Sequence, residues 1–108
     1  ERISDLVEFL DENYMDPYDR RELARKFEFN EDYMLQIFKK QTGMTISQYI
    51  NARRVDAAKQ LIAETDGTII DIAYRVGFDN ITYFHRIFKN MTGTTPREFR
   101  RGGNAPAG

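Results

Sequence analysis

Cysteine is absent from this sequence, and histidine occurs once, as His85. Without cysteine the chain has no disulfide, no thiol nucleophile and no cysteine-based zinc site. A single histidine also leaves no histidine cluster that would bind a metal. We therefore expect no metal site, and the lack of cysteine fits a protein of the reducing cytoplasm, where we expect this one.

Long apolar runs are also missing, so no segment is predicted to span a membrane. The sequence has no glycine-rich phosphate loop and no paired carboxylates in an apolar setting, which argues against an enzyme and against a bound cofactor. Apolar residues make up 41% of the 108 residues and charged residues 31%, an ordinary composition for a globular protein. This length suits one domain, or two very small ones that share a helix.

The net charge is only −1, but it is unevenly distributed. Residues 1–19 contain one basic and seven acidic residues, a net charge of −6, which leaves +5 for residues 20–108. The chain begins with Glu1, has no signal-peptide pattern, and ends in small residues. We expect it to be a fragment of a larger protein, with residues 102–108 as a flexible tail.

The longest helical pattern covers residues 45–64. Its apolar or small residues recur every three or four positions, at Ile46, Tyr49, Ile50, Ala57, Ala58, Leu61 and Ile62. Thr45 and Gln48 form a capping box at its start, and Gly67 is predicted to end it in the left-handed conformation. At about 1.5 Å per residue, this helix would be roughly 30 Å long.

Shorter helices are predicted on both sides of residues 45–64. A helix over residues 3–14 comes first, and the predicted starts of the others are Asp19, Asn30, Thr68, Asp79 and Thr95. Glycines mark the ends and turns, at Gly43, Gly77 and Gly93. The inward faces carry the aromatic residues Phe78, Phe84, Phe88 and Phe99, which we assign to the core.

The pattern before the long helix is repeated after it. F-K-K-Q-T-G at residues 38–43 matches F-K-N-M-T-G at 88–93, and Leu23-Ala24 matches Ile72-Ala73, with an offset that grows from 49 to 50. The sequence therefore predicts an all-α fold of seven helices within residues 1–101. Two helix-turn-helix units, at about 19–43 and 68–93, are joined by the helix over 45–64, and a last helix covers 95–101.

Helical hairpins occur in many proteins, so this pattern alone is a weak indication of function. A linking helix of roughly 30 Å, however, would hold two such units about one turn of B-DNA apart, which is roughly 34 Å. This spacing is compatible with a domain that enters two successive major grooves of double-stranded DNA, but by itself it favours that hypothesis no more than the alternative. The alternative is a helical protein-interaction module with little or no DNA binding, which the net charge favours.

The second repeat resembles the signature of the AraC/XylS family of bacterial transcription regulators. The matching residues are Ile72-Ala73, Val76-Gly77-Phe78, Tyr83-Phe84, Phe88-Lys89, Gly93, Thr95-Pro96 and Phe99-Arg100, and the similarity extends back over about residues 3–101. The resemblance implies two helix-turn-helix units that bind adjacent major grooves of bent DNA. It also implies a parent chain with a sensing or receiver domain, and an activator that contacts RNA polymerase.

Residues left outward after the core is assigned are the candidates for DNA contact. For bases they are Asn80, Ile81, Thr82, His85 and Arg86 in the second unit, and Glu31, Asp32, Leu35 and Gln36 in the first. Arg86 suits guanine, Gln36 suits adenine, and Ile81 can meet a thymine methyl. Lys39, Lys40, Lys89 and Arg97 are the predicted phosphate contacts.

Glu31 and Asp32 depart from the family, whose members often have small or basic residues there. Carboxylates repel phosphate and can only accept hydrogen bonds, for instance from cytosine N4. We therefore expect the second unit to do more of the base reading than the first. Arg54 falls on the inward stripe of the long helix, so we predict a structural role for it, with Asp71 as a candidate partner.

Overall fold

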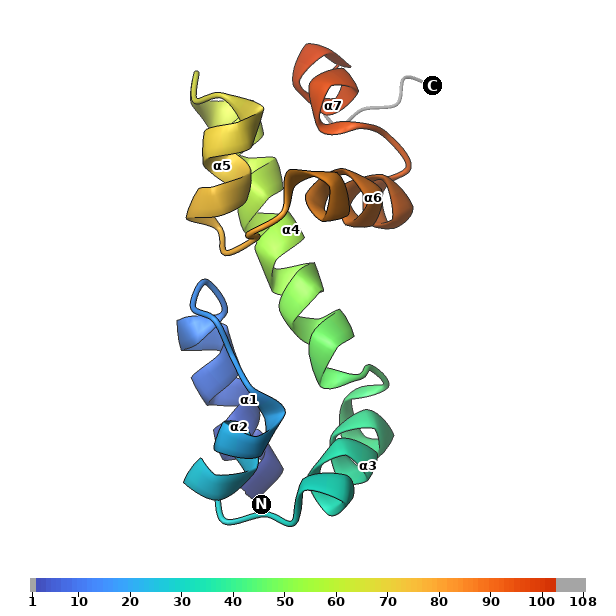
Figure 1. The fold of residues 1–108 in the computed structure, drawn as a ribbon. Helices are drawn as coiled ribbons and strands as arrows, with labels where there is room; N and C mark the ends of the chain where they lie inside the picture. The colour runs from blue at the N-terminus through green and yellow to red at the C-terminus, as the bar shows by residue number, and fades with distance from the viewer. Residues whose placement is uncertain (1, 103–108) are drawn as a thin grey trace. The chain divides into compact units, whose positions relative to one another are not determined.

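The computed structural model describes residues 2–102, and within that range it contains seven helices and no strand (Figure 1). The helices are α1 (Arg2–Asn13), α2 (Arg20–Lys26), α3 (Glu31–Thr42), α4 (Ile46–Glu64), α5 (Ile69–Arg75), α6 (Ile81–Thr92) and α7 (Pro96–Gly102). The all-α prediction is confirmed. Gly102, predicted to belong to the tail, is the last residue of α7, and residues 103–108 lie outside the described range.

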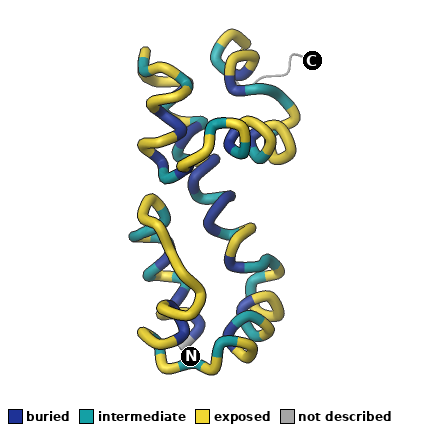
Figure 2. The backbone as a smooth tube through the Cα atoms, viewed as in Figure 1, coloured by how far each residue is buried: buried dark blue, intermediate teal, exposed yellow. Residues whose placement is uncertain are grey.

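The chain divides into two compact units, residues 1–51 and 52–108. Each unit has its own hydrophobic core, and α4 supplies residues to both cores. The first core consists of Ile3, Leu6, Leu10, Leu23, Ala24, Met34, Phe38, Ile46 and Ile50. The second consists of Val55, Ala58, Ile62, Ile72, Ala73, Val76, Phe78, Phe84, Phe88 and Phe99. Buried positions recur every three or four residues along α1, α3, α4 and α6, as the periodicity predicts (Figure 2).

In the first unit, a hydrogen bond ties the start of the chain to α4. The Tyr49 hydroxyl donates to the Asp11 carboxylate at 2.6 Å, and the Tyr49 ring meets the Phe38 ring edge-on with 5.7 Å between centroids. Tyr49 thus presents its apolar side to the core and its polar end to α1. One of the seven acids of residues 1–19 therefore has a structural role.

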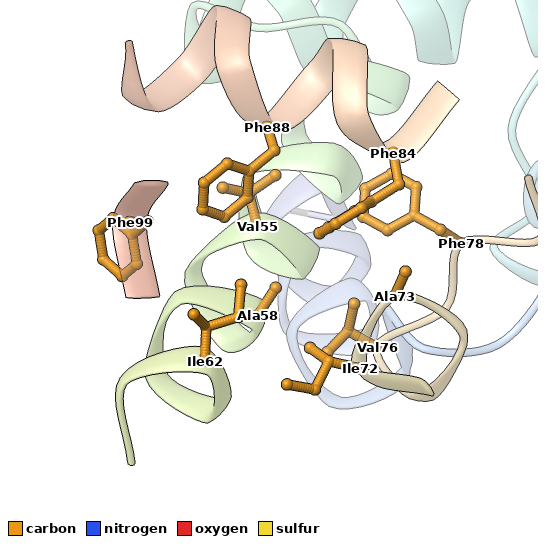
Figure 3. Packing of buried hydrophobic residues seen from close by; sticks show 10 residues of the cluster. All are labelled: Val55, Ala58, Ile62, Ile72, Ala73, Val76, Phe78, Phe84, Phe88 and Phe99. Atoms are coloured by element: carbon orange, nitrogen blue, oxygen red, sulfur yellow. The ribbon is translucent and has the colours of Figure 1, made fainter. Parts of the chain in front are cut away.

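Aromatic rings dominate the core of the second unit (Figure 3). The Phe84 ring lies 5.1 Å from that of Phe78 and 5.6 Å from that of Phe88, and Phe88 lies 5.7 Å from Phe99, all between centroids. These four residues are buried, which confirms their assignment to the core. Val55 is also buried although the predicted stripe of the long helix omits it.

Both helix pairs turn through a residue with positive φ. In the second unit this residue is Gly77, at φ 118°, which confirms the prediction for its turn. In the first unit it is Glu28, at φ 60°. The turns share a hydrogen bond, because the Phe29 N–H donates to the Ala24 carbonyl at 2.8 Å and the Phe78 N–H donates to the Ala73 carbonyl at 3.0 Å. Glu28 therefore occupies a backbone conformation that favours glycine.

Gly77→Val is expected to lower the free energy of unfolding by about 1 kcal/mol or more, because a β-branched side chain is strained at positive φ. Glu28→Gly is the matched change in the other turn and should raise it by about 0.5–1 kcal/mol, since glycine relieves the strain there. Urea denaturation followed by circular dichroism measures both effects. Equal stability of wild type and Gly77→Val would contradict the assigned strain.

α3 and α6 begin in the same way. The Asn30 side-chain oxygen accepts from the Tyr33 N–H at 3.0 Å, and the Asn80 oxygen accepts from the Tyr83 N–H at 2.8 Å. The prediction that Asp79 caps α6 is wrong, because the cap is Asn80. The turn of the second unit is one residue longer, and that residue moves the cap from position 79 to position 80.

α3 and α6 also end in the same way. Gly43 and Gly93 follow them at φ 79° and 85°, which confirms both predicted stops. The hydroxyl groups of Thr42 and Thr92 each donate to the carbonyl four residues earlier, at 2.8 Å in both cases. Each hydroxyl also accepts from the N–H two residues later, at 3.2 Å. Both helices have 12 residues between an asparagine cap and a glycine stop. We call this shared set of caps and stops the common frame of α3 and α6.

α4 begins and ends where the prediction places it, but the predicted left-handed stop after it is absent. The Thr45 and Gln48 side chains each accept from the other residue's N–H, at 3.0 and 2.9 Å, so the capping box is confirmed. Gly67 does not have positive φ; among the described glycines, positive φ occurs at Gly43, Gly77 and Gly93. The predicted left-handed stop at Gly67 is therefore wrong.

Arg100 of α7 takes part in ending α4. Its Nε donates to the Ile62 carbonyl at 3.1 Å, and its Nη2 donates to the Thr65 carbonyl at 3.1 Å. The Thr65 hydroxyl donates to the Leu61 carbonyl at 2.7 Å. The carbonyls at the end of a helix lack partners within it and carry partial negative charge, so a guanidinium there satisfies both needs.

Arg100→Ala is expected to lower the free energy of unfolding by about 1–2 kcal/mol, because two charge-assisted hydrogen bonds to the end of α4 are lost. Arg101→Ala is the control, since Arg101 is an exposed neighbour with the same charge, and it should change stability by no more than about 0.5 kcal/mol. Urea titration of both variants makes the comparison. Equal effects would show that net charge matters rather than the cap.

Candidate nucleic-acid interface

One face of α6 is polar and exposed. Thr82, His85, Arg86 and Lys89 are exposed on this helix, at the spacing of a single helical face. The opposite face carries Phe84 and Phe88, which are fully buried in the core of the second unit. Burial of the aromatic face therefore fixes which side chains the helix offers to a partner.

Arg86 is held in place by an aromatic neighbour. Its guanidinium carbon lies 5.2 Å from the centroid of the Tyr83 ring, within the range of a cation–π contact. Tyr83 is half-buried and packs against the core of the second unit. The core thus orients the ring, and the ring orients the arginine, which reduces the conformational entropy lost when Arg86 binds a partner.

Two predicted base-contact residues of the second unit have structural duties as well. The side-chain oxygen of Asn80 is used as the cap of α6, which leaves its NH₂ group as the part suited to a base edge. Ile81 is half-buried and packs against the core, although the prediction placed it outward. Their contacts with bases remain predictions.

The equivalent face of α3 carries Asp32, Gln36, Lys39 and Lys40, all exposed as predicted. Leu35, which was also predicted to face outward, is half-buried against the core of the first unit. A partner of the first unit therefore meets one carboxylate, one amide and two lysines on this face. The prediction of an exposed side chain is thus correct for these four residues and wrong for Leu35.

Glu31 is engaged by an arginine that the sequence did not point to. Its Oε2 lies 3.7 Å from Nε of Arg20, in an ion pair whose side chains are 34% and 59% exposed, respectively. Arg20 belongs to α2 and Glu31 to α3, so the pair joins the two helices of the first unit. The negative charge of Glu31 is thereby partly compensated at this end of α3.

Two further arginines differ in their surroundings. Arg97, a predicted phosphate contact, is exposed on α7 as is Lys89 on α6. Arg54 is buried, with its guanidinium carbon 5.7 Å from the centroid of the Phe78 ring. Its burial confirms the inward assignment, while its pairing with Asp71 remains a prediction.

The start of α7 is closed by a capping box of Thr95 and Glu98. The Glu98 carboxylate accepts from the Thr95 N–H at 3.0 Å, and the Glu98 N–H donates to the Thr95 hydroxyl at 3.1 Å. The bond from the Thr95 backbone lowers the pKa of Glu98, and the charges of Lys89 and Arg101 act in the same direction. Near neutral pH this carboxylate is ionised, so the exposed charge around α7 is mixed in sign.

Residues 2–102 contain no group of three or more histidine or acidic side chains arranged to hold a metal ion. No helix in the same range is long and apolar enough to cross a membrane.

The family model described as "Helix-turn-helix domain" matches residues 23–102. The HTH-type transcriptional activator RhaR of Cronobacter sakazakii is 38% identical over 92 residues, 85% of this chain and 32% of that one. The chain thus spans about a third of this relative's length.

Two solved structures share the fold. One, a transcriptional regulator from Chromobacterium violaceum described as an AraC-type DNA-binding domain-containing protein, has a TM-score of 0.83 and 25% identity, covering 99% of this chain and 95% of that chain. The other is the C-terminal domain of the two-component response regulator yesN from Fusobacterium nucleatum, with a TM-score of 0.83 and 28% identity over 93% of this chain and 99% of that chain.

Proposed function

The chain belongs to the AraC/XylS family of helix-turn-helix DNA-binding domains of transcription regulators, and we propose that it reads base sequence in two adjacent major grooves. The observation that carries this proposal is the exposed face of α6, with Thr82, His85, Arg86 and Lys89 opposite a buried aromatic face. A recognition helix needs this division, because one side must bind the scaffold while the other enters the groove.

Arg86 is the principal base reader in this proposal. Its two-pronged donor matches O6 and N7 of guanine, and the Tyr83 ring supports it from the side. His85 and the NH₂ group of Asn80 hydrogen-bond neighbouring base edges. Lys89 and Arg97 bind phosphates and thereby set the register of the second unit on the duplex.

The first unit makes a different set of contacts. Gln36 suits adenine, and Lys39 and Lys40 bind phosphates, while the Asp32 carboxylate repels phosphate and adds no affinity. Because the outward residues of α3 and α6 differ, the two units read different sequences. The binding site should therefore contain two dissimilar blocks rather than a palindrome.

Footprinting on a selected site tests the two-groove proposal. We expect protection over about two helical turns, with two contacted blocks roughly 10 bp apart. We also expect bent DNA, at a cost on the order of 1–6 kcal/mol that phosphate contacts offset. A single contacted block on straight DNA would overturn the two-groove reading but leave DNA binding intact.

DNA binding itself is tested by selecting sites from random duplex DNA and titrating salt. We expect log K to fall linearly with log salt concentration, since bound lysine and arginine release counterions from the DNA. If no duplex is enriched and no salt-dependent binding occurs, the alternative of a helical protein-interaction module is favoured.

The remaining proposals concern the parent protein. The likeness to a response regulator's C-terminal domain supports a parent with a receiver or other sensing domain. The likeness to a transcriptional activator supports activation through contact with RNA polymerase. Such a regulator works in the cytoplasm, where bacterial DNA lies, and its role at DNA needs neither a cofactor nor catalysis.

A further inference from the structure

The ion pair between Arg20 and Glu31 joins the first residues of two helices. Arg20 is the first residue of α2 and Glu31 the first of α3. The 3.7 Å separation joins Nε of the guanidinium to one carboxylate oxygen. The terminal nitrogens of Arg20 carry further N–H donors. Its side chain is 59% exposed, so these donors can be reached from solvent.

In the second unit, uncharged residues occupy the positions that correspond to Arg20 and Glu31. The first residues of α5 and α6 are Ile69 and Ile81. Both are half-buried and pack against the core of the second unit. An apolar pair is thus compatible with this fold, and an exposed ion pair adds little stability in general. The charges in the first unit therefore call for a reason other than folding.

We propose that Arg20 binds a DNA phosphate and that Glu31 is a positioning residue that holds the arginine in place for this contact. The inference rests on the proposed DNA-binding function. The first helix of a helix-turn-helix unit crosses the DNA backbone, and the start of the second helix approaches the base edges. The contact between Arg20 and Glu31 lies between those two regions.

Glu31 then has the opposite effect from the one expected of an isolated carboxylate. Alone at the start of α3 it would repel phosphate, but next to Arg20 it orients a cation whose remaining donors suit a phosphate in bidentate geometry. Preorganisation of this kind raises affinity because less side-chain entropy is lost on binding. Glu31 and Asp32, adjacent in sequence, should therefore respond differently to removal of their charges.

The first test is the salt dependence of binding to a duplex selected from random DNA by the wild-type protein. Arg20→Ala should weaken binding severalfold and reduce the slope of log K against log salt by about 0.9, the contribution of one phosphate contact. Arg25→Ala is the matched control, since Arg25 is exposed near the other end of α2 and has the same charge. A slope unchanged by Arg20→Ala, or reduced equally by Arg25→Ala, would overturn the proposal.

The second test isolates Glu31 through a double-mutant cycle. Glu31→Gln should weaken binding severalfold in the wild-type background. In the Arg20→Ala background the same change should leave affinity unchanged or raise it, because only repulsion of phosphate remains. If Glu31 had only a structural role, Glu31→Gln would change the affinity in the same direction in both backgrounds. An increase in affinity in both backgrounds would show that Glu31 merely repels DNA.

The third test replaces the ion pair of the first unit by the isoleucines found at the corresponding positions of the second unit. Arg20→Ile combined with Glu31→Ile should keep the melting temperature within a few degrees, yet reduce the salt slope by about 0.9. A double variant that melts normally and retains the wild-type slope would overturn the proposal. Failure of the wild type to bind any duplex would instead overturn the DNA-binding function, so the two failures are distinct.

Discussion

Replacing Phe88 by alanine is expected to lower the free energy of unfolding of the second unit by about 3–5 kcal/mol. Phe88 is fully buried, and its ring contacts that of Phe84, one turn earlier on α6, and that of Phe99 on α7. Its removal leaves a cavity that these rings cannot fill without leaving their own positions. The total free energy of unfolding of a small domain is only about 5–15 kcal/mol, so this loss is a large part of the stability.

Residue-level hydrogen exchange is the measurement for Phe88→Ala. Because each unit has its own core, amides of α5–α7 should lose protection while those of α1–α3 keep theirs. Phe38→Ala is the matched variant, since Phe38 is the fully buried counterpart in the first unit, and it should show the reverse pattern. Equal loss of protection in both units for either variant would show that they unfold together.

Arg86→Ala is expected to weaken binding to a selected duplex by about 1–3 kcal/mol and to relax the base preference at one position. The loss has two sources, because the guanidinium provides the base contact and the Tyr83 ring preorganises it. Asp32→Ala in the first unit should instead leave affinity unchanged or raise it, since that carboxylate repels phosphate. The two variants thus measure how much the outward residues of each unit contribute to the affinity for DNA.

Fluorescence anisotropy with the selected duplex, repeated with each single-base variant of the site, provides the comparison. For Arg86→Ala the loss should be largest for the preferred base and small for the others, so that the specificity ratio falls. Thermal denaturation of both variants is the control, because both side chains are exposed and neither should affect folding. Equal losses of affinity at Arg86 and Asp32 would show that the carboxylate reads a base.

The sequence predicts the helices and most of their ends well because the signals are local. Thr45 and Gln48, or Thr95 and Glu98, are three residues apart, so their hydrogen bonds are fixed once the helix forms. Asp79 is the exception. Both Asp79 and its neighbour Asn80 suit a cap, and only the length of the preceding turn selects between them.

The contacts that the sequence did not reveal join distant residues. Arg100 reaches the end of α4 across 35 and 38 residues, and Tyr49 reaches Asp11 across 38. Neither contact leaves a periodic trace in the sequence. At the end of α4 the Gly67 N–H donates to the Thr65 hydroxyl at 3.3 Å, and Arg100 binds the carbonyls of Ile62 and Thr65, so the helix ends without the left-handed stop predicted at Gly67.

The candidate interface was predictable in part. Periodicity places Gln36, His85 and Arg86 outward, because the helix phase is fixed by the buried phenylalanines. It does not place Leu35 and Ile81, which lie at the border of the apolar stripe, where neighbouring helices decide how much of the side chain is covered. The role of Glu31 was hidden as well, because its partner Arg20 lies on another helix.

The common frame of α3 and α6 has an evolutionary consequence. Asn30 and Gly43 enclose 12 residues in one unit, and Asn80 and Gly93 enclose 12 in the other. The bonds of this frame involve caps, hydroxyls and backbone, and of the outward residues predicted to contact bases only Asn80 takes part in them. Mutations on the outward faces can therefore accumulate under selection for new operators while the frame stays under selection for folding, so that after duplication the two halves diverge in specificity without diverging in architecture.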